Sequence, residues 1–273
     1  MIFHQPELAI QPTHAQPSKE DRCVVFDQGR VLLCHEGDTP TLPTFAQLQP
    51  DFPPFELART SNTGFFSPHP FQPACVAEKG TLRYEPLGIF RDLPHGDAAL
   101  IVSCWHLWSW YACNRYCGRC GAPVQPDEAE RALRYPKCGR MIYPMIAPAV
   151  IVAITCQNRI LLARNAHSSF AHYALISGYV EVGETLEQAV RREAQEEVGI
   201  RLLDLRYLGD QPWGISGSHM FAFHATADDR QPLRIQQSEL SDARWFDRAE
   251  LPERKHAVSV AFELIERFRL GQL

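Results

Sequence analysis

The second half of the chain has an apolar pattern that predicts a sheet. Residues 147–155 form a near-continuous apolar run, which is typical of a buried strand. Gln157 and Asn158 follow this run and predict a hairpin turn into the next strand. Further strands are predicted at 159–164, 173–177, 202–208, 220–227 and 244–246.

Two helices are predicted among these strands. The first spans about 184–198, with acidic residues in its first turn that complement the helix dipole, and Gly199 follows its end. The second spans 256–269 and has the apolar pattern of an amphipathic helix. The apolar stripe of the first helix consists of Leu186, Ala189, Val190, Ala194 and Val198. Strands with helices that cover their sheet indicate an α/β sandwich.

The first half of the chain predicts a β-rich region in which we find no catalytic motif. Residues 23–26 and 30–34 flank a glycine-containing connection, which predicts a β-hairpin. Asp97 is a suitable N-cap for a buried helix at 98–112. Core or interface roles are expected for Trp105, Trp108 and Trp110 in this helix. The other segments are expected to be a loosely ordered arm at 1–22, loops with one short helix at 38–56, and strands at 74–77 and 81–84.

The composition is that of an ordinary globular protein. The chain has 273 residues, a length that is enough for two domains and a sizeable core. Of these residues 45% are hydrophobic and 22% are charged, which is ordinary for a globular protein. The formal net charge is −5 and there is no basic tract. Extended contact with nucleic acid is therefore not expected, although a single nucleotide or an RNA 5′ end is left open.

The sequence predicts a cytoplasmic location without a membrane partner. The first twenty residues lack the positive start and apolar run of a signal peptide. The longest apolar stretch, 98–112, is too short and too polar to span a bilayer. Nine cysteines without a secretion signal indicate a reducing compartment rather than disulfides.

Three glutamates on the helix at 184–198 carry the candidate chemistry. Glu193, Glu196 and Glu197 stand at i, i+3 and i+4, so their carboxylates project from one face. Such a cluster repels itself unless a cation lies between its members, and Mg²⁺ prefers oxygen ligands of this kind. The alternative is a solvated acidic face paired with Arg191 and Arg192.

The segment between the two halves resembles a zinc ribbon. Cys117 and Cys120 precede a glycine, as in a zinc knuckle, and a second knuckle is expected 15–20 residues later. At the second knuckle Cys138 precedes a glycine, but Tyr135 stands in the first cysteine position. Structural zinc sites almost always have four ligands, and Cys113 does not have the spacing of a ribbon ligand. A bound Zn²⁺ and a metal-free remnant therefore both remain open.

The glutamate helix and the loop before it resemble the Nudix box. The matching positions are Gly178, Glu184 and the run 192–200, with Ala194 where a larger aliphatic residue is usual. The resemblance implies a loop–helix–loop that binds divalent metal and cleaves a nucleoside diphosphate linked to another group. It implies that Glu184 and Arg192 hold the loop against the helix. Its implied metal ligands are Glu193, Glu197 and the carbonyl of Ser177. For Glu196 it implies one of two roles, either a third carboxylate ligand or a group that helps to activate water.

The order of segments is similar to that of the NADH pyrophosphatase subfamily of Nudix hydrolases. The resemblance implies a Nudix α/β/α sandwich with a mixed sheet, preceded by a zinc-ribbon-like segment and a β-rich N-terminal domain. The implied domains are 1–112, 113–144 and 145–273. The subfamily also implies a homodimer.

A marker motif of this subfamily follows the box but is altered in this chain. In the stretch 210–218, the matches are Gln211, Pro212, Trp213 and Ser218. The Ser, Pro, Phe and Pro of the marker are replaced by Asp210, Gly214, Ile215 and Ser216, which removes a stacking surface and loosens the loop. Further substrate contacts implied by the resemblance are Arg91, Glu130, Tyr143, Tyr179 and Ala261, and Glu239 is an implied fourth metal carboxylate.

The implied reaction is hydrolysis of a pyrophosphate bond with Mg²⁺ or Mn²⁺. The expected substrate is NADH or NAD, which gives NMN(H) and AMP. The altered marker leaves open ADP-ribose, another nucleoside diphosphate derivative, or NAD-capped RNA. An alternative of a different class is a nucleotide-sensing Nudix protein without catalysis, against which the three intact glutamates argue.

Overall fold

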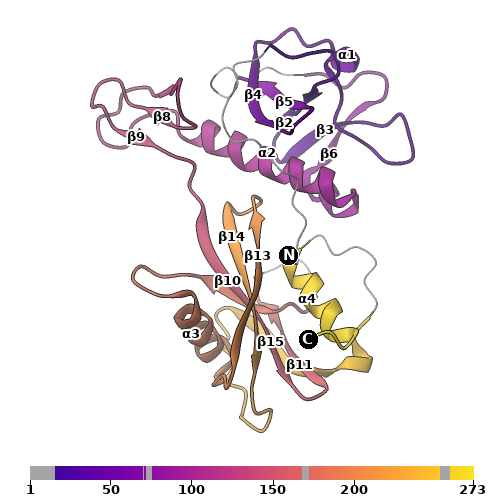
Figure 1. Cartoon of the computed structure of the whole chain (residues 1–273), viewed down its shortest axis with the longest axis vertical. Helices are drawn as coiled ribbons and strands as arrows, with labels where there is room; N and C mark the ends of the chain where they lie inside the picture. The colour runs from indigo at the N-terminus through magenta and orange to yellow at the C-terminus, as the bar shows by residue number, and fades with distance from the viewer. Residues whose placement is uncertain (1–15, 70, 72–75, 168–171, 253–258) are drawn as a thin grey trace. The chain divides into compact units, whose positions relative to one another are not determined.

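The computed structural model describes residues 16–69, 71, 76–167, 172–252 and 259–273. By their contacts, these residues form two compact units. One unit contains 146–213 and 218–273, and the other contains the described residues up to Met145 together with Gly214–Gly217. In the first unit, helices α3 (Leu186–Val198) and α4 (Val260–Arg269) cover opposite faces of one sheet, which is the predicted sandwich (Figure 1).

The sheet of the C-terminal unit is mixed. Its strand order is β13-β14-β10-β11-β15, and β12 pairs with β10. The β10–β14 pair is parallel, whereas the other pairs are antiparallel. The strands are β10 (Ala147–Cys156), β11 (Arg159–Asn165), β12 (Ile176–Tyr179), β13 (Leu205–Trp213), β14 (Ser218–Thr226) and β15 (Leu240–Asp247).

Alternation along β10 divides the core into two layers. Val150, Val152 and Ile154 pack with the apolar stripe of α3 (Leu186–Val198), while Ile151 and Ala153 pack with α4 (Val260–Arg269). Since side chains of a strand point to alternate faces, a near-continuous apolar strand requires cover on both sides. The short 3₁₀ helix η2 (Arg248–Glu250) follows β15.

The N-terminal unit contains two small sheets and a long helix. The first sheet has the order β1-β5-β4 and the second β2-β3-β6. Helix α2 (His95–Cys113) follows the 3₁₀ helix η1 (Leu87–Asp92). Trp110 is buried, and Trp105 stacks on Trp108 with ring centroids 5.6 Å apart. The elements are β1 (Arg22–Cys23), β2 (Phe26–Asp27), β3 (Arg30–Cys34), α1 (Phe45–Leu48), β4 (Pro54–Arg59), β5 (Gly64–Pro68) and β6 (Leu82–Pro86).

The ribbon segment belongs to the same unit. Its three two-residue strands form a sheet in the order β7-β8-β9. These strands are β7 (Gln125–Pro126), β8 (Leu133–Arg134) and β9 (Met141–Ile142). None of the helices among the described residues is long and apolar enough to cross a membrane.

Several predicted boundaries were wrong. Helix α2 begins at His95 with Pro94 as its N-cap residue, and Asp97 lies in its first turn instead of capping it. Helix α3 begins at Leu186 because Thr185 forms a capping box with Gln188. The predicted strand at 23–26 is divided, because β1 pairs with β5 while β2 pairs with β3.

Other predicted strands are displaced or absent. Strand β12 lies at Ile176–Tyr179 instead of 173–177, and β13 begins at Leu205 and extends through part of the marker. Val76 and Ala77 are not in a strand, and 74–75 lie outside the described residues. The predicted start of the last helix at 256 also lies outside them, and α4 begins after Ser259, whose hydroxyl accepts a hydrogen bond from the Phe262 amide.

Candidate active site

The loop before α3 is fixed to the helix by one arginine. The Arg192 guanidinium donates to both carboxylate oxygens of Glu184, at 2.8 and 3.0 Å, and to the Tyr179 carbonyl at 2.9 Å. Glu184 also accepts a hydrogen bond from the Glu181 amide at 3.0 Å. These contacts confirm that Glu184 and Arg192 hold the loop against the helix.

The same guanidinium contacts two of the three clustered glutamates. Arg192 donates to Glu193 at 2.7 Å and to Glu196 at 3.0 Å. The Glu193 side chain is buried, whereas that of Glu196 is 54% exposed. The alternative of a solvated, arginine-paired acidic face therefore describes Glu196. Glu193 is paired with Arg192 but buried, and so is not part of a solvated face.

Glu197 is buried without a cationic partner. It is 7% exposed, and within the described part of the chain its carboxylate makes no hydrogen bond or ion pair. Burial and the nearby charges of Glu193, Glu239 and Glu196 raise the pKa of Glu197 to about 8. A buried carboxylate among three others is a costly arrangement unless a cation compensates it.

Gly178 leaves room for the carboxylate of Glu193. A Cβ atom at Gly178 would lie 2.0 Å from Glu193 Oε1 and 2.1 Å from its Cδ. Gly178 lies on strand β12 and pairs with Val150 of β10. Because Gly178 has no side chain, the backbone of β12 can lie beneath the Glu193 side chain. Ser177, whose carbonyl is a predicted metal ligand, directly precedes Gly178 and is exposed. The first glycine of the box is thus required for space, not for a left-handed backbone.

Glu239 lies near the helix carboxylates although it is 42 residues beyond Glu197 in sequence. Its charge raises the pKa of both Glu193 and Glu197, for which burial is the largest cause. The segment before it is tied to α3, since the Gln236 amide donates to the Glu197 carbonyl at 2.9 Å. The Gln236 side chain donates to Glu239 Oε1 at 3.2 Å. The four predicted carboxylates are therefore close enough for their charges to interact, but among the described residues only the ribbon cysteines form a group whose ligand atoms lie within 4.8 Å of one another.

This donor set fits a hard divalent cation. All four side chains offer oxygen, the ligand type that Mg²⁺ and Mn²⁺ prefer. The unpaired, buried Glu197 is the position where a cation would remove the largest electrostatic cost. Arg192 contacts Glu193 and Glu196 from the loop side, so it also limits the repulsion among the carboxylates.

Strand β13, which carries the first residues of the marker (the marker strand), contacts the start of α4. Gln211 is 3% exposed, and its Oε1 accepts a hydrogen bond from the Val260 amide at 2.7 Å. This bond brings the two predicted substrate positions Gln211 and Ala261 close together. Ser218, another marker position, is also buried. Gln211 and Ser218 thus have packing roles that the sequence did not reveal.

A polar cluster on the marker strand was missed by the sequence reasoning. Asp210, which replaces the serine of the marker, accepts a hydrogen bond from the Tyr207 hydroxyl at 2.5 Å and lies 2.7 Å from His219 Nε2. These two contacts lower the pKa of Asp210. The His219 ring stacks on Phe221 with centroids 4.9 Å apart. Only strand pairing could have revealed this cluster, because the three residues are not adjacent in sequence.

Three other predicted substrate positions lie in the N-terminal unit. The Tyr143 hydroxyl donates to Glu130 at 2.7 Å, so these two are brought together, and the bond raises the pKa of Tyr143. Arg91 lies in η1, with its guanidinium 4.7 Å from the ring centroid of Phe90. Tyr179, which belongs to the C-terminal unit, is 52% exposed.

The ribbon cysteines form a compact group. Among the described residues, the ligand atoms of Cys117, Cys120 and Cys138 lie within 4.8 Å of one another. Burial opposes ionisation of Cys117, but hydrogen bonds from the Arg119 amide and neighbouring groups lower its pKa to about 7. Cys113 is exposed and does not join this group.

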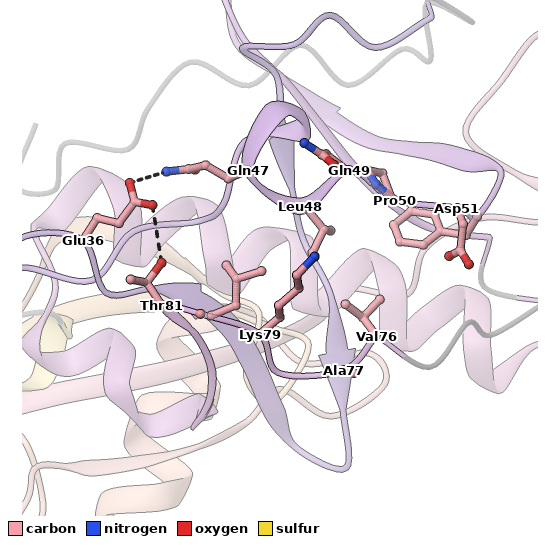
Figure 2. Close-up of a pocket in the computed structure, with 13 residues that line it drawn as sticks. Glu36, Gln47, Leu48, Gln49, Pro50, Asp51, Val76, Ala77, Lys79 and Thr81 are labelled. Atoms are coloured by element: carbon pink, nitrogen blue, oxygen red, sulfur yellow. Dashed lines mark hydrogen bonds between the residues drawn. The ribbon is translucent and has the colours of Figure 1, made fainter.

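A separate pocket of about 570 Å³ lies in the N-terminal unit. Figure 2 shows Glu36 bonded to Gln47 and Thr81 on one side, with Leu48 and Lys79 nearby. None of the predicted site residues lines this pocket. It therefore adds nothing to the glutamate site.

Comparisons with known proteins agree with this architecture. A model of the NUDIX domain matches residues 145–268, and a model of the NADH pyrophosphatase zinc ribbon domain matches residues 113–143. A protein of Salmonella heidelberg (strain SL476), named NAD-capped RNA hydrolase NudC, is 39% identical over 187 residues, or 67% of this chain and 72% of the relative. A protein of the same name from Pasteurella multocida (strain Pm70) is 39% identical over 177 residues, or 64% and 67%.

A solved structure is also similar in part. The crystal structure of a NUDIX hydrolase from Nitrosomonas europaea has a TM-score of 0.49 at 24% identity, and the match covers 56% of this chain and 90% of that chain.

The chain belongs to the Nudix hydrolase family, in the subfamily whose Nudix domain follows an NADH pyrophosphatase zinc ribbon. Nudix hydrolases act with divalent cations on nucleotide substrates. The predictions of family, α/β fold class and pyrophosphohydrolase activity are thereby confirmed.

Proposed function

We propose that this chain hydrolyses the pyrophosphate bond of a dinucleotide, with NADH or NAD as substrate and NMN(H) and AMP as products. The observation that carries the proposal is the buried, unpaired Glu197 surrounded by Glu193, Glu196 and Glu239. We assign these four carboxylates, with the Ser177 carbonyl, as ligands of Mg²⁺ or Mn²⁺. Relatives named NAD-capped RNA hydrolase support an NAD-containing substrate.

The residues of this chain have distinct proposed tasks. A divalent cation held there supplies charge neutralisation for the pyrophosphate and makes hydroxide available near neutral pH. Glu196 or Glu197 takes the remaining proton. Arg192 keeps Glu193 and Glu196 in place, so that the carboxylates face the substrate. No side chain forms a covalent intermediate in this scheme.

Substrate binding is assigned to exposed aromatic and marker residues. Tyr179 is 52% exposed beside the box and presents a ring on which a base can stack. Gln211 positions Ala261 at the start of α4 through its bond to Val260. The remaining proposed contacts are Arg91, Glu130, Tyr143, Pro212, Trp213 and Ser218.

The altered marker favours a second candidate substrate class. Asp210 with its partners Tyr207 and His219 places a charged cluster where the subfamily has a serine. A change of charge in a substrate loop shifts which second moiety is accepted, while the cleaved bond stays the same. ADP-ribose, another nucleoside diphosphate derivative, and an NAD-capped RNA 5′ end are therefore the alternatives.

The decisive experiment is product analysis with NADH, NAD⁺, ADP-ribose and NAD-capped RNA in Mg²⁺ and in Mn²⁺. Metal-dependent AMP and NMNH from NADH support the first substrate. AMP only from ADP-ribose, or decapping alone, moves the specificity to the second class. Tight nucleotide binding without turnover by any substrate overturns the enzyme assignment and supports a nucleotide sensor.

Three further assignments rest on the subfamily and the sequence. We propose a homodimer, a cytoplasmic location, and the domain division 1–112, 113–144 and 145–273. No extended nucleic-acid contact is proposed, because the net charge is −5. Light scattering tests the dimer, and a monomer at working concentration contradicts it.

We also assign Cys117, Cys120 and Cys138 as ligands of Zn²⁺ in the ribbon.

A further inference from the structure

The two hairpins of the ribbon keep matching backbone turns although one has lost a cysteine. The Gly121 amide donates to the Cys117 carbonyl at 2.9 Å, and the Gly139 amide donates to the Tyr135 carbonyl at 2.8 Å. Gly121 and Gly139 both have left-handed φ values, of +69° and +71°. Tyr135 therefore occupies the position of the first ligand in a turn that is otherwise intact.

Three sulfur atoms converge between these turns. The Cys117 and Cys138 Sγ atoms lie 3.8 Å apart, and Cys120 completes a group whose ligand atoms lie within 4.8 Å. The Arg119 amide donates to Cys117 Sγ at 3.4 Å. Cys117 is 3% exposed. Converging thiolates are the ligands that select zinc over harder cations.

The fourth corner of a tetrahedron lacks a protein sulfur. Tyr135 is 4% exposed, and burial together with the charges of the three nearby cysteines raises the pKa of its hydroxyl. A tyrosine hydroxyl lies further from its Cβ than a cysteine sulfur does, so Tyr135 does not reproduce the sulfur ligand of the usual first cysteine, and tyrosine is a rare zinc ligand. Cys113 is exposed and outside the group. A three-ligand zinc site keeps an open position for a small ligand, as catalytic zinc sites do.

We propose that the ribbon binds one Zn²⁺ through Cys117, Cys120 and Cys138 and leaves its fourth coordination position to an exchangeable small ligand, either water or a low-molecular-weight thiol. The inference rests on the zinc assignment made above but not on the hydrolytic activity. Its consequence is a labile zinc that exchanges with solution ligands, in contrast to the closed four-ligand site of a structural ribbon.

The test compares the wild-type chain with Tyr135→Cys, Tyr135→Phe and Cys138→Ser. Zinc content is measured after purification, and zinc release to a chromogenic chelator is timed. We expect one zinc per chain in the wild type and in Tyr135→Phe. We expect release at least about tenfold faster than from Tyr135→Cys, because even loss of an outer partner of a ligand changes metal affinity by that factor. Cys138→Ser should retain little zinc.

Cobalt substitution supplies a second readout. The sulfur-to-cobalt absorption of the wild type should be weaker than that of Tyr135→Cys and should rise when dithiothreitol occupies the open position. A wild type without zinc overturns the zinc assignment itself. Zinc release as slow as in Tyr135→Cys, or loss of zinc in Tyr135→Phe, overturns only the open position, since the fourth ligand would then come from the protein.

Discussion

At the residue scale, the site depends on which carboxylates are buried and on what surrounds them. Glu197 and Glu193 are 7% and 8% exposed, whereas the Glu196 side chain is 54% exposed and paired with Arg192. Their spacing on the helix gives all three the same direction, but only packing against β12 and the segment before Glu239 gives them different environments. The charge of Glu197 and the space around Glu193 can therefore be tested by separate substitutions.

Glu197→Gln removes the charge and keeps the shape of the side chain. We expect the variant to fold, because an unpaired buried carboxylate becomes a neutral amide. Turnover should fall by about a hundredfold or more, since the variant loses a metal ligand and a candidate proton acceptor. Steady-state hydrolysis of NADH or ADP-ribose measures the loss. A near wild-type rate would remove Glu197 from the mechanism.

Gly178→Ala tests space at the same site. Its Cβ would lie 2.0 Å from Glu193 Oε1, and the flexible end of that side chain can move away. We therefore expect a change in unfolding free energy of at most about 1 kcal/mol, together with a metal affinity about tenfold or more weaker because a ligand is displaced. Gly96→Ala is the matched control, since its Cβ would meet nothing within 4 Å. Unchanged Mn²⁺ binding in Gly178→Ala would show that Glu193 does not need this space.

At the scale of elements, α3 is defined by its two ends. Thr185 accepts a hydrogen bond from the Gln188 amide, and the Gln188 side chain accepts one from the Thr185 amide. At the other end Gly199 has a φ of +72°, and its amide bonds to the carbonyls of Ala194 and Gln195. Both ends are local patterns, which is why the sequence placed this helix within two residues.

Thr185→Ala removes the side-chain cap of α3. The expected loss of unfolding free energy is about 1 kcal/mol, because the Gln188 amide loses its acceptor. Chemical denaturation followed by circular dichroism measures it. Thr185→Ser keeps the hydroxyl and should retain most of the stability. Equal destabilisation by both substitutions would mean that the threonine methyl, not the cap, matters.

At the scale of the whole molecule, the structure contains two compact units, and the carboxylate site belongs to the C-terminal one. Strands far apart in sequence build its support, since β10 pairs in parallel with β14 from Ala147↔Ser218 to Thr155↔Thr226. The site contains a net excess of negative charge in the folded state. The free energy of unfolding of the chain should therefore increase when a cation binds to this site.

Metal addition and removal should shift the melting temperature. Mg²⁺ or Mn²⁺ at 100 times the dissociation constant should stabilise the folded chain by about 2.7 kcal/mol per site, and EDTA should reverse the shift. Calorimetry with and without metal measures this effect. Without metal, Glu197→Gln should melt at or above the wild type, and it should gain less from Mn²⁺. An equal gain in both proteins would place the stabilising cation elsewhere.

The sequence by itself determined the helix, its direction and the chemistry of its polar face. A helical period places Glu193, Glu196 and Glu197 together whatever lies around them, and Gly199 ends the helix through its own backbone freedom. The resemblance to the family motif predicted a divalent metal and the pyrophosphate bond as the bond to be cleaved. These features depend on residues a few positions apart, which is why they could be predicted.

Only the tertiary structure decided the environment of those residues. Gln211 bonds to Val260, 49 residues away, and Asp210 contacts His219 across paired strands. The burial of Glu197 and the space above Gly178 likewise depend on segments that meet only after folding. Periodicity and capping are set by the local backbone, so the sequence revealed them. Burial and strand pairing are set by contacts between distant residues, so only the tertiary structure revealed them.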